Sequence, residues 1–356
     1  MIEVTCTGTP FEVGLQHGKS GKKQVVGSMA FYEGLFQRTC ALDWDEVKRR
    51  AAGFIPSLEQ LCPRYLEEMR GLAVGAGVDL LDIIALNVRS EITFGMFTDN
   101  PSLPVKHDGC TAFACRNSNG DVYLAQNWDW EVAQADNLLV CHISQPDRPK
   151  VTMVTEAGVI GKIGFNSSGV GTCLNAIRAK GVDTNRLPIH LALRTALEAT
   201  SARAATEAIM EAGVAASAHI LVADKDEAIG LECTSQGTKL LEMKADSREP
   251  IVHTNHLILN HPHVNEPPWL PDSNARLERM SHLLQGRVAG GDADDDESLF
   301  GLFYDEEGYP GAINRCQIGT SEAETLFNIT MDLGKKQAKV SFGRPRQGID
   351  RHLFSM

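Results

Sequence analysis

The sequence predicts an α+β protein in which a mainly helical N-terminal segment is followed by layered β-sheets covered by helices. Three observations support this. Helix-start signals dominate the first hundred residues, strand-like segments follow residue 110, and two helical segments interrupt those strands before further strands and helices. This order differs from the regular strand–helix alternation of a doubly wound sheet. No glycine-rich dinucleotide or phosphate-binding motif is present in the sequence, so we do not expect a nucleotide cofactor.

Helix-capping residues recur through the N-terminal segment. Thr9 precedes a proline, and Glu12 stands three residues after it, which is the spacing of a capping box. Residues 43–46 repeat the acidic start of a helix, and Asp79 with Asp82 opens the apolar segment "LLDIIALN". We therefore expect several helices before residue 96.

Residues 96–107 carry prolines and show no periodicity, so we expect an exposed connector there. The sequence pattern changes after this connector. The segments "TAFAC" and "VYLAQNW" flank "RNSNGD", where Gly120 can take a positive φ, and this pattern predicts a β-hairpin. The following segments predict strands, then two helices, the second of which starts at Ser201, and then further strands. A polar loop is expected at 260–272, and helices are expected near 274–286 and 296–304. The segments "TLFNITMDL" and "QAKVSFG" predict a final hairpin.

Composition excludes several classes of function. The chain has 356 residues, 43% of them apolar, which is enough for a substantial core. Its net charge of −12 argues against nucleic acid or an anionic membrane surface as the main partner. Its apolar runs are much shorter than the roughly 18 residues of a membrane-spanning helix. We therefore expect no nucleic-acid partner and no membrane partner.

The chain contains nine cysteines, an odd number, and no Cys-x-x-Cys pair. His253 and His256 have the spacing of metal ligands, but no cysteine lies near them in the sequence, so no zinc site is predicted. Because the sequence also shows no secretory signal, we expect reduced thiols and a cytoplasmic protein without a metal or other cofactor.

One cysteine stands at an unusual junction. In "HDGCTAFAC", Cys110 directly follows Gly109 and directly precedes a predicted strand. If the bond between these two residues is cut, Cys110 carries both a thiol and an α-amine, whose reference pKa of about 8 suits a general base. The thiol could make the cut itself by attacking the Gly109 carbonyl. Taken alone, however, a cysteine beside a strand is more often a small buried apolar residue.

Two further segments support a site at Cys110. Asp129, in "QNWDW", lies on the second arm of the predicted hairpin and could hold the α-amine, although a strand-end turn also explains it. Asn255, in "HTNH", could donate to an oxyanion, although a turn asparagine is the simpler interpretation. Asn166 and Asn175 flank a glycine-rich hairpin and need no functional explanation.

Taken together, these segments resemble the fungal acyl-coenzyme A:6-aminopenicillanic acid acyltransferases, which are N-terminal-nucleophile (Ntn) hydrolases. The resemblance extends over most of the chain and rests on these segments: "GTPFEVGLQHG", "LNVRSE", "DGCT", "QNWDW", "TEAGVIGKIGFNSSGV", "HLALRTALE", "AASAHILV", "VHTNH" and "TLFNITMDLGKKQAKVSFGRP". It implies a four-layer αββα sandwich and a role in secondary metabolism. It also implies self-cleavage between Gly109 and Cys110 into associated fragments 1–109 and 110–356. Cys110 would then be the nucleophile, Asp129 the support of the amine, and Asn255 an oxyanion donor.

One departure from the family concerns the choice of acceptor. Where the penicillin-forming enzyme has an arginine, this chain has Glu322. A carboxylate in a partly buried acceptor pocket would repel an anionic acceptor such as 6-aminopenicillanic acid. Arg315 could supply the missing cation, and a surface ion pair is its alternative role. We take Thr111, Arg315 and Glu322 as candidate substrate-binding residues.

The sequence is therefore compatible with three alternative functions. The first is a self-processing acyltransferase that moves an acyl group from an acyl-CoA thioester or an amide, through Cys110, to an amine. The second is an amidohydrolase or thioesterase that uses the same site with water as the acceptor. The third is an uncut, inactive relative that acts as a binding protein.

Overall fold

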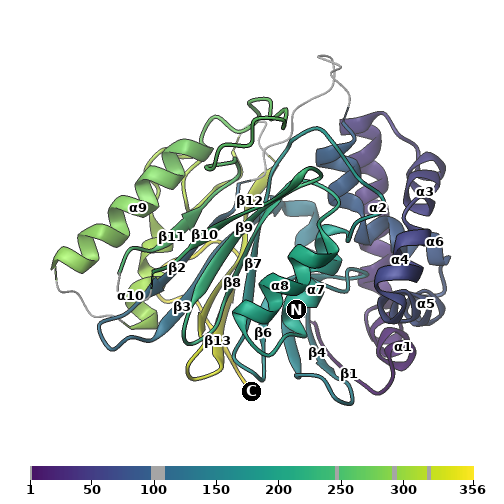
Figure 1. Ribbon diagram of the computed structural model, residues 1–356, viewed down its shortest axis with the longest axis horizontal. Coiled ribbons are helices and arrows are strands. Elements are labelled where there is room, and N and C mark those ends of the chain that lie inside the picture. Colours follow the sequence, from purple (N-terminus) through teal and green to yellow (C-terminus); the bar gives the residue numbers. More distant parts are fainter. Residues whose placement is uncertain (1, 98–108, 245–247, 291–294, 319–321) are drawn as a thin grey trace.

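The structure is a computed structural model that describes residues 2–97, 109–244, 248–290, 295–318 and 322–356. Two β-sheets face each other, and helices cover the outer face of each sheet (Figure 1). Helices α7 (Ile189–Leu197) and α8 (Ala202–Ala212) pack on one sheet, and α9 (Ser273–Gly290) and α10 (Asp296–Gly301) pack on the other. The arrangement is the four-layer αββα sandwich that the resemblance implies.

The larger sheet has eight strands in the order β1-β4-β5-β6-β7-β8-β9-β10. All neighbours are antiparallel except β1 and β4, which are parallel. The strands are β1 (Ile2–Thr7), β4 (Leu138–Ser144), β5 (Val151–Glu156), β6 (Ile163–Asn166), β7 (Gly171–Ala176), β8 (Ala218–Ala223), β9 (Ala228–Thr234) and β10 (Gly237–Glu242).

The smaller sheet has six antiparallel strands in the order β11-β2-β3-β12-β13-β14. They are β11 (Ile251–His253), β2 (Thr111–Arg116), β3 (Val122–Glu131), β12 (Ala323–Asp332), β13 (Gln337–Phe342) and β14 (His352–Ser355). The predicted hairpin is the pair β2–β3, and Gly120 in its turn has a φ of 92°. The predicted final hairpin is β12–β13, but β14 follows it and was not expected from the sequence.

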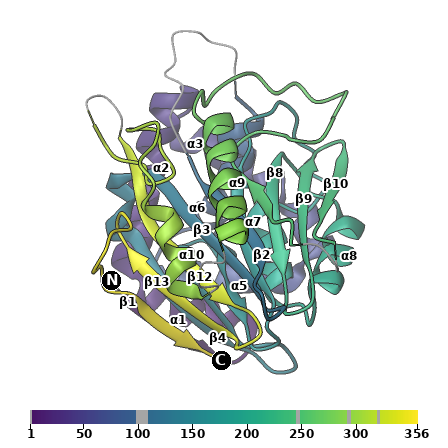
Figure 2. The same ribbon diagram turned by 90° about the vertical axis from the view of Figure 1, so that its left-hand side faces the viewer.

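The N-terminal helices pack beside the sandwich (Figures 1 and 2). They are α1 (Pro10–Ser20), α2 (Lys22–Cys40), α3 (Trp44–Ala52), α4 (Ile55–Leu61), α5 (Pro63–Ala76), α6 (Leu80–Asn87) and the π-helix η1 (Glu91–Gly95); two short 3₁₀ helices, η2 (Val132–Asn137) and η3 (Leu302–Tyr304), lie later in the chain. The predicted capping boxes of Thr9 with Glu12 and of Asp79 with Asp82 are both present.

The N-terminal segment is not wholly helical, because its first strand joins the larger sheet. Strand β1 pairs with β4 from Ile2 opposite Leu139 to Thr7 opposite Ser144. A sequence pattern does not show such a pairing, since the partner strand lies more than a hundred residues away. Most of the connector predicted at residues 96–107 lies outside the described residues.

Strand alternation in β2 decides which of its side chains face the sandwich interior. Cys110, Ala112 and Ala114 belong to the main core, which lies partly between the two sheets. Phe113 and Cys115 face the other way, into a smaller core under α9 and α10. A period of two therefore points Cys110 inward, toward β7, which β2 contacts across the sandwich. Within the described residues, none of the helices is long and apolar enough to cross a membrane.

Candidate active site

Cys110 lies immediately before β2, between the two sheets. Its side chain is 1% exposed, and its thiol donates to the carbonyl oxygen of Asp129 over 3.8 Å. The pairing of Thr111 with Asn127 places Cys110 beside Trp128 on the neighbouring strand. The hairpin therefore brings Cys110 and Asp129 together, as the sequence predicted.

The carboxylate of Asp129 is fully buried and held in a fixed orientation. The hydroxyl of Thr325, on β12, donates to Asp129 Oδ1 over 2.6 Å, and Arg315 Nε lies 3.3 Å from Asp129 Oδ2. Arg315 Nη2 also donates to Asp272 Oδ1 over 2.8 Å. Arg315 is itself buried, so it forms part of the site and not the surface ion pair considered from the sequence.

Gly109 packs directly against Arg315. A Cβ atom on Gly109 would lie 2.2 Å from Arg315 Nη2 and 2.3 Å from Arg315 Nε. The guanidinium is the end of a flexible side chain, but its bonds to Asp129 and Asp272 restrict its movement. The contact therefore explains why glycine suits the position before Cys110.

Arg276, on α9, connects three parts of the site and was missed in the sequence. Its Nη1 donates to the carbonyl oxygen of Cys110 over 2.8 Å and to Thr111 Oγ1 over 3.1 Å. Its Nη2 donates to Asn255 Oδ1 over 3.0 Å. The candidate Thr111 is fully buried, with its hydroxyl on Arg276. No sequence signal marked Arg276, because its segment resembles any amphipathic helix start.

Asn255 is fully buried, and its amide orientation is set by its neighbours. Its Oδ1 accepts from Arg276, so its amide nitrogen points the other way. One N–H of that nitrogen donates to the carbonyl oxygen of Ala176 over 3.0 Å. Among the described residues the second N–H has no acceptor, which leaves it free to bind a substrate oxygen.

The two asparagines of the glycine-rich hairpin differ in their roles. Asn175 Nδ2 donates to the carbonyl oxygens of Cys110, over 3.2 Å, and His253, over 3.3 Å. Asn175 Oδ1 is 3.1 Å from His219 Nδ1, which acts as the donor because the oxygen only accepts. Asn166 binds the carbonyl oxygens of Leu197 and Ala199 and has a structural role. Asn175 thus belongs to the site, although nothing in the sequence distinguished it from Asn166.

Glu322 occupies a different environment from Arg315. It is exposed, at the residue before β12, and does not lie in the partly buried pocket expected from the sequence. Repulsion between an exposed carboxylate and an anionic acceptor is screened by water and salt, and amounts to about 1 kcal/mol or less at close range. We therefore expect a small effect of Glu322 on the choice of acceptor.

The buried charges around Cys110 balance one another. Arg276 and Arg315 face Asp129 and Asp272. Burial opposes ionisation of Asp272, but the two arginines outweigh it and hold the pKa of that carboxyl below its usual range. The described part of the chain contains no group of three or more side chains arranged to hold a metal ion. The arrangement instead suits chemistry on a thiol with nearby fixed hydrogen-bond donors.

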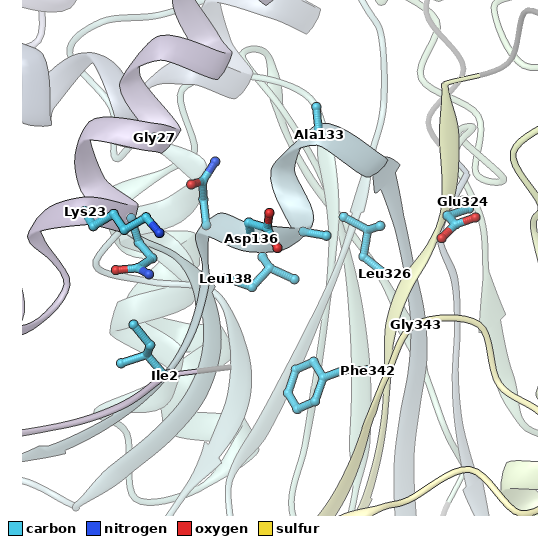
Figure 3. A pocket seen from close by; sticks show the side chains of 13 residues that line it. Ile2, Lys23, Gly27, Ala133, Asp136, Leu138, Glu324, Leu326, Phe342 and Gly343 are labelled. Carbon is cyan, nitrogen blue, oxygen red and sulfur yellow. The ribbon is translucent and has the colours of Figure 1, made fainter.

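A separate cavity of about 680 Å³ lies near the first strand (Figure 3). Its lining includes Lys23 and Gly27 from α2, Asp136 from η2, and Leu326 and Phe342 from the smaller sheet. None of the residues described above at Cys110 lines this cavity. It is not part of the candidate active site.

Sequence comparison decides the family. The chain is 40% identical, over 348 residues, to the acyl-coenzyme A:6-aminopenicillanic-acid-acyltransferase 40 kDa form of Emericella nidulans, covering 97% of this chain and 93% of the relative. The chain belongs to the acyl-coenzyme A:6-aminopenicillanic acid acyltransferase family. The family match covers residues 115–347, which begins just after Cys110. This acyltransferase homologue is therefore an enzyme, with acyltransferase or amidohydrolase chemistry.

Solved structures of Ntn hydrolases share the fold of this acyltransferase homologue. A variant of the conjugated bile acid hydrolase from Clostridium perfringens matches with a TM-score of 0.51 and 13% identity, covering 69% of this chain and 92% of that chain. The penicillin V acylase from Agrobacterium tumefaciens matches with a TM-score of 0.50 and 12% identity, covering 69% and 86%. At this identity the likeness establishes the Ntn-hydrolase fold alone.

Proposed function

We propose that this enzyme cuts itself between Gly109 and Cys110 and then transfers acyl groups through a thioester on Cys110. One observation carries the proposal. The thiol of Cys110 lies buried beside Asp129, and Arg276 and Asn175 both bind its carbonyl oxygen, so the residue is held rigidly at the junction. Such fixed placement of a reacting atom is what a nucleophile requires.

In the self-cleavage step, Cys110 Sγ attacks the carbonyl carbon of Gly109. The peptide C–N bond breaks, the nitrogen takes a proton and becomes the α-amine of Cys110, and a thioester joins the two residues. Water then hydrolyses the thioester, which gives a Gly109 carboxylate and a free thiol. Arg315, which packs on Gly109, is a cation close to this new carboxylate.

In the transfer step, the α-amine of Cys110 takes the thiol proton as the sulfur attacks the carbonyl of an acyl-CoA thioester or an amide. The free N–H of Asn255 donates to the oxyanion, and the carboxylate of Asp129 orients the amine. Coenzyme A or an amine leaves with the proton. An acceptor amine then attacks the Cys110 thioester, or water does so and releases a free acid.

The two fragments, 1–109 and 110–356, would stay associated after the cut, because buried contacts join them. Strand β1 remains in the sheet through β4. Arg194 forms a buried bidentate pair with Glu68, over 2.8 and 2.9 Å. Asn87 donates to the carbonyl oxygen of Gly158 over 2.8 Å. Contacts of this kind hold a cleaved chain together as one folded unit.

The acyl acceptor is an amine, and the name of the Emericella nidulans relative makes 6-aminopenicillanic acid the first compound to test. We place the enzyme in secondary metabolism and in the cytoplasm. The second placement rests on its cysteines, because all nine are free thiols, which a reducing compartment maintains.

The test is intact mass spectrometry of the purified protein before and after incubation with a panel of acyl-coenzyme A donors. We expect fragments ending at Gly109 and starting at Cys110, and a donor acyl group on the second fragment. Cys110→Ala should give one uncut, inactive chain, and Cys110→Ser should cut slowly because a hydroxyl is the weaker nucleophile. Efficient cutting of Cys110→Ala would refute self-cleavage by this thiol, and an uncut unmodified chain would favour the inactive binding relative.

A further inference from the structure

A buried cluster of charges lies between the N-terminal helices and the larger sheet. Its centre is Glu156, at the end of β5. Lys162 Nζ donates to Glu156 over 2.8 Å, and Arg89 also pairs with this carboxylate. The hydroxyl of Tyr32 donates to it as well, and Gln134 donates over 3.3 Å. The mechanism above assigns no role to this cluster.

Two cations share the carboxylate of Glu156. Burial opposes ionisation of Glu156, but Arg89 and Lys162 outweigh burial and hold the pKa of Glu156 far below its usual range. Burial lowers the pKa of Lys162 to about 8, against the opposing effect of Glu156. Near pH 7 the carboxylate of Glu156 therefore pairs with two cations. This pairing is buried, because the side chains of Lys162 and Glu156 are at most 1% exposed.

Lys162 connects the cluster to the surroundings of Cys110 through Trp128. Its Nζ lies 4.4 Å from the ring centroid of Trp128, which the β2–β3 register places beside Cys110. Burial lowers the pKa of Lys162, and a thiolate on Cys110 acts in the opposite direction, as the carboxylate of Glu156 does. Interaction between two charges is mutual, so the ammonium group stabilises the thiolate by the same amount.

The loop that carries Lys162, residues 157–162, is fixed on several sides. Asn87 donates to Gly158 O over 2.8 Å and accepts from Ile160 N over 3.0 Å. Arg194 donates to the carbonyl oxygen of Ile160 over 2.8 Å, and His190 Nδ1 donates to that of Gly161 over 2.9 Å. A charge held this firmly needs no rearrangement when the thiolate forms.

We propose that Lys162 is a positioning residue whose buried ammonium group stabilises the thiolate of Cys110. The inference rests on the proposed function of Cys110 and adds to it the source of the thiol's reactivity. A stabilised thiolate forms at lower pH, and the thiolate is the reacting species in both self-cleavage and acyl transfer.

Titratable and charged groups on other elements also influence the pKa of the Cys110 thiol. From β3 comes Asp129, whose carboxylate is bound by Thr325 and Arg315. From α9 comes Arg276, which binds the carbonyl oxygen of Cys110. On α7, burial and the nearby cations hold the pKa of His190 well below its usual value, so it stays neutral. The cut adds the α-amine of Cys110 and the carboxylate of Gly109, and all of these groups are unchanged in variants of Lys162.

The experiment measures the alkylation rate of Cys110 by iodoacetamide from pH 5 to 10, on cut protein. Tandem mass spectrometry of the peptide that begins at Cys110 separates this thiol from the other eight, because fragment ions distinguish it from Cys115 in the same peptide. We expect Lys162→Met to raise the midpoint of the pH profile by about one pH unit or more. Lys162→Arg should restore the original midpoint, and Lys225→Met, at an exposed ion pair with Asp226, should leave it unchanged.

A second variant of the cluster reverses the sign of the effect. Glu156→Gln is made in the Lys162→Arg variant, because Glu156 keeps Lys162 protonated and an arginine stays ionised without it. The change removes the negative charge alone, so its midpoint should fall below that of Lys162→Arg. A purely structural role of the cluster predicts shifts in the same direction for Lys162→Met and Glu156→Gln. If Lys162→Met does not fold, as shown by its thermal unfolding, the direction of the Glu156→Gln midpoint decides alone.

Failure of the proposed function and failure of the role of Lys162 give different results. An unmodified chain that neither cuts nor accepts an acyl group would remove the proposed function itself. An unmodified chain that cuts and is acylated on Cys110, but whose alkylation midpoint is the same in Lys162→Met, would overturn only the role of Lys162. A midpoint that rises or stays unchanged in Glu156→Gln would also overturn it.

Discussion

The guanidinium group of Arg315 lies against the α-carbon of Gly109, so closely that a methyl group there would come within 2.2 Å of Nη2. The same guanidinium pairs with the buried carboxylate of Asp129 and with Asp272. The residue before the proposed cut and the carboxylate beside the nucleophile therefore share one cation. A substitution at Gly109 should therefore disturb the ion pair between Arg315 and Asp129.

Gly109→Ala should slow self-cleavage at least about tenfold. The added methyl group would force Arg315 to move away from Asp129 or Asp272, or force the peptide to move away from Cys110 Sγ. An increase of about 1.4 kcal/mol in the activation free energy already lowers the cleavage rate tenfold. A gel time course after synthesis of the chain gives the rate. Gly286→Ala is the matched control, since it lies exposed on α9 with nothing within 4 Å of the new Cβ. Equal cutting rates in Gly109→Ala and the unmodified chain would show that the contact with Arg315 is irrelevant.

Asn255→Ala should lower kcat by about 100- to 1,000-fold and leave KM nearly unchanged, because an oxyanion donor acts mainly in the transition state. The measurement needs protein confirmed as cut, since self-cleavage forms an oxyanion too. Asn185→Ala, at an exposed asparagine that bonds only locally to Asp183, is the control. A raised KM with an unchanged kcat would make Asn255 a binding residue instead.

Glu322→Arg should raise kcat/KM for 6-aminopenicillanic acid relative to a neutral amine by less than about tenfold. The position is exposed, so the reversed charge acts through solvent. Competition assays with phenylacetyl-coenzyme A and both acceptors measure the ratio, and Glu207→Arg on the outer helix α8 makes the same change of charge elsewhere. A gain of several hundredfold would mean that the side chain enters the acceptor pocket during catalysis.

Glu91→Gln should flatten the pH dependence of stability. Glu91 is fully buried, its Oε1 accepts from Ile189 N over 2.6 Å, and its Oε2 has no partner among the described residues. Burial raises the pKa of Glu91 to about 7, above the value of 4.5 for an unperturbed glutamate. The protonated form therefore stabilises the folded state fully below pH 4.5, and this contribution is lost as the pH rises through 7.

The pKa difference of Glu91 corresponds to about 2–3 kcal/mol between pH 5 and pH 8. Denaturant unfolding at both pH values, on protein in the same state of cleavage, gives the free energy of unfolding. The loss of stability toward pH 8 should be smaller in Glu91→Gln by that amount. Glu59→Gln, at an exposed position, should keep the original slope. An unchanged slope in Glu91→Gln would show that Glu91 is ionised in the folded protein.

Local features of the fold could be predicted from the sequence because they depend on neighbours in the chain. The capping boxes of Thr9 and Asp79 and the turn at Gly120 follow from residue types at fixed spacings. The approach of Cys110 to Asp129 follows from hairpin geometry, since only 19 positions separate them. The family motifs supplied the αββα architecture, which no local pattern could have specified.

The sequence by itself determined the hairpin, the capped helices and the junction at Cys110. Only the tertiary structure decided which distant side chains complete the site. Arg276 lies 166 positions from Cys110, and Arg315 lies 186 positions from Asp129. Lys162 packs on Trp128 from the loop before β6, and Glu322, which departs from the family, is exposed. The physical reason is that burial and pairing of charges depend on how the layers pack, and packing brings together residues that no spacing along the chain relates.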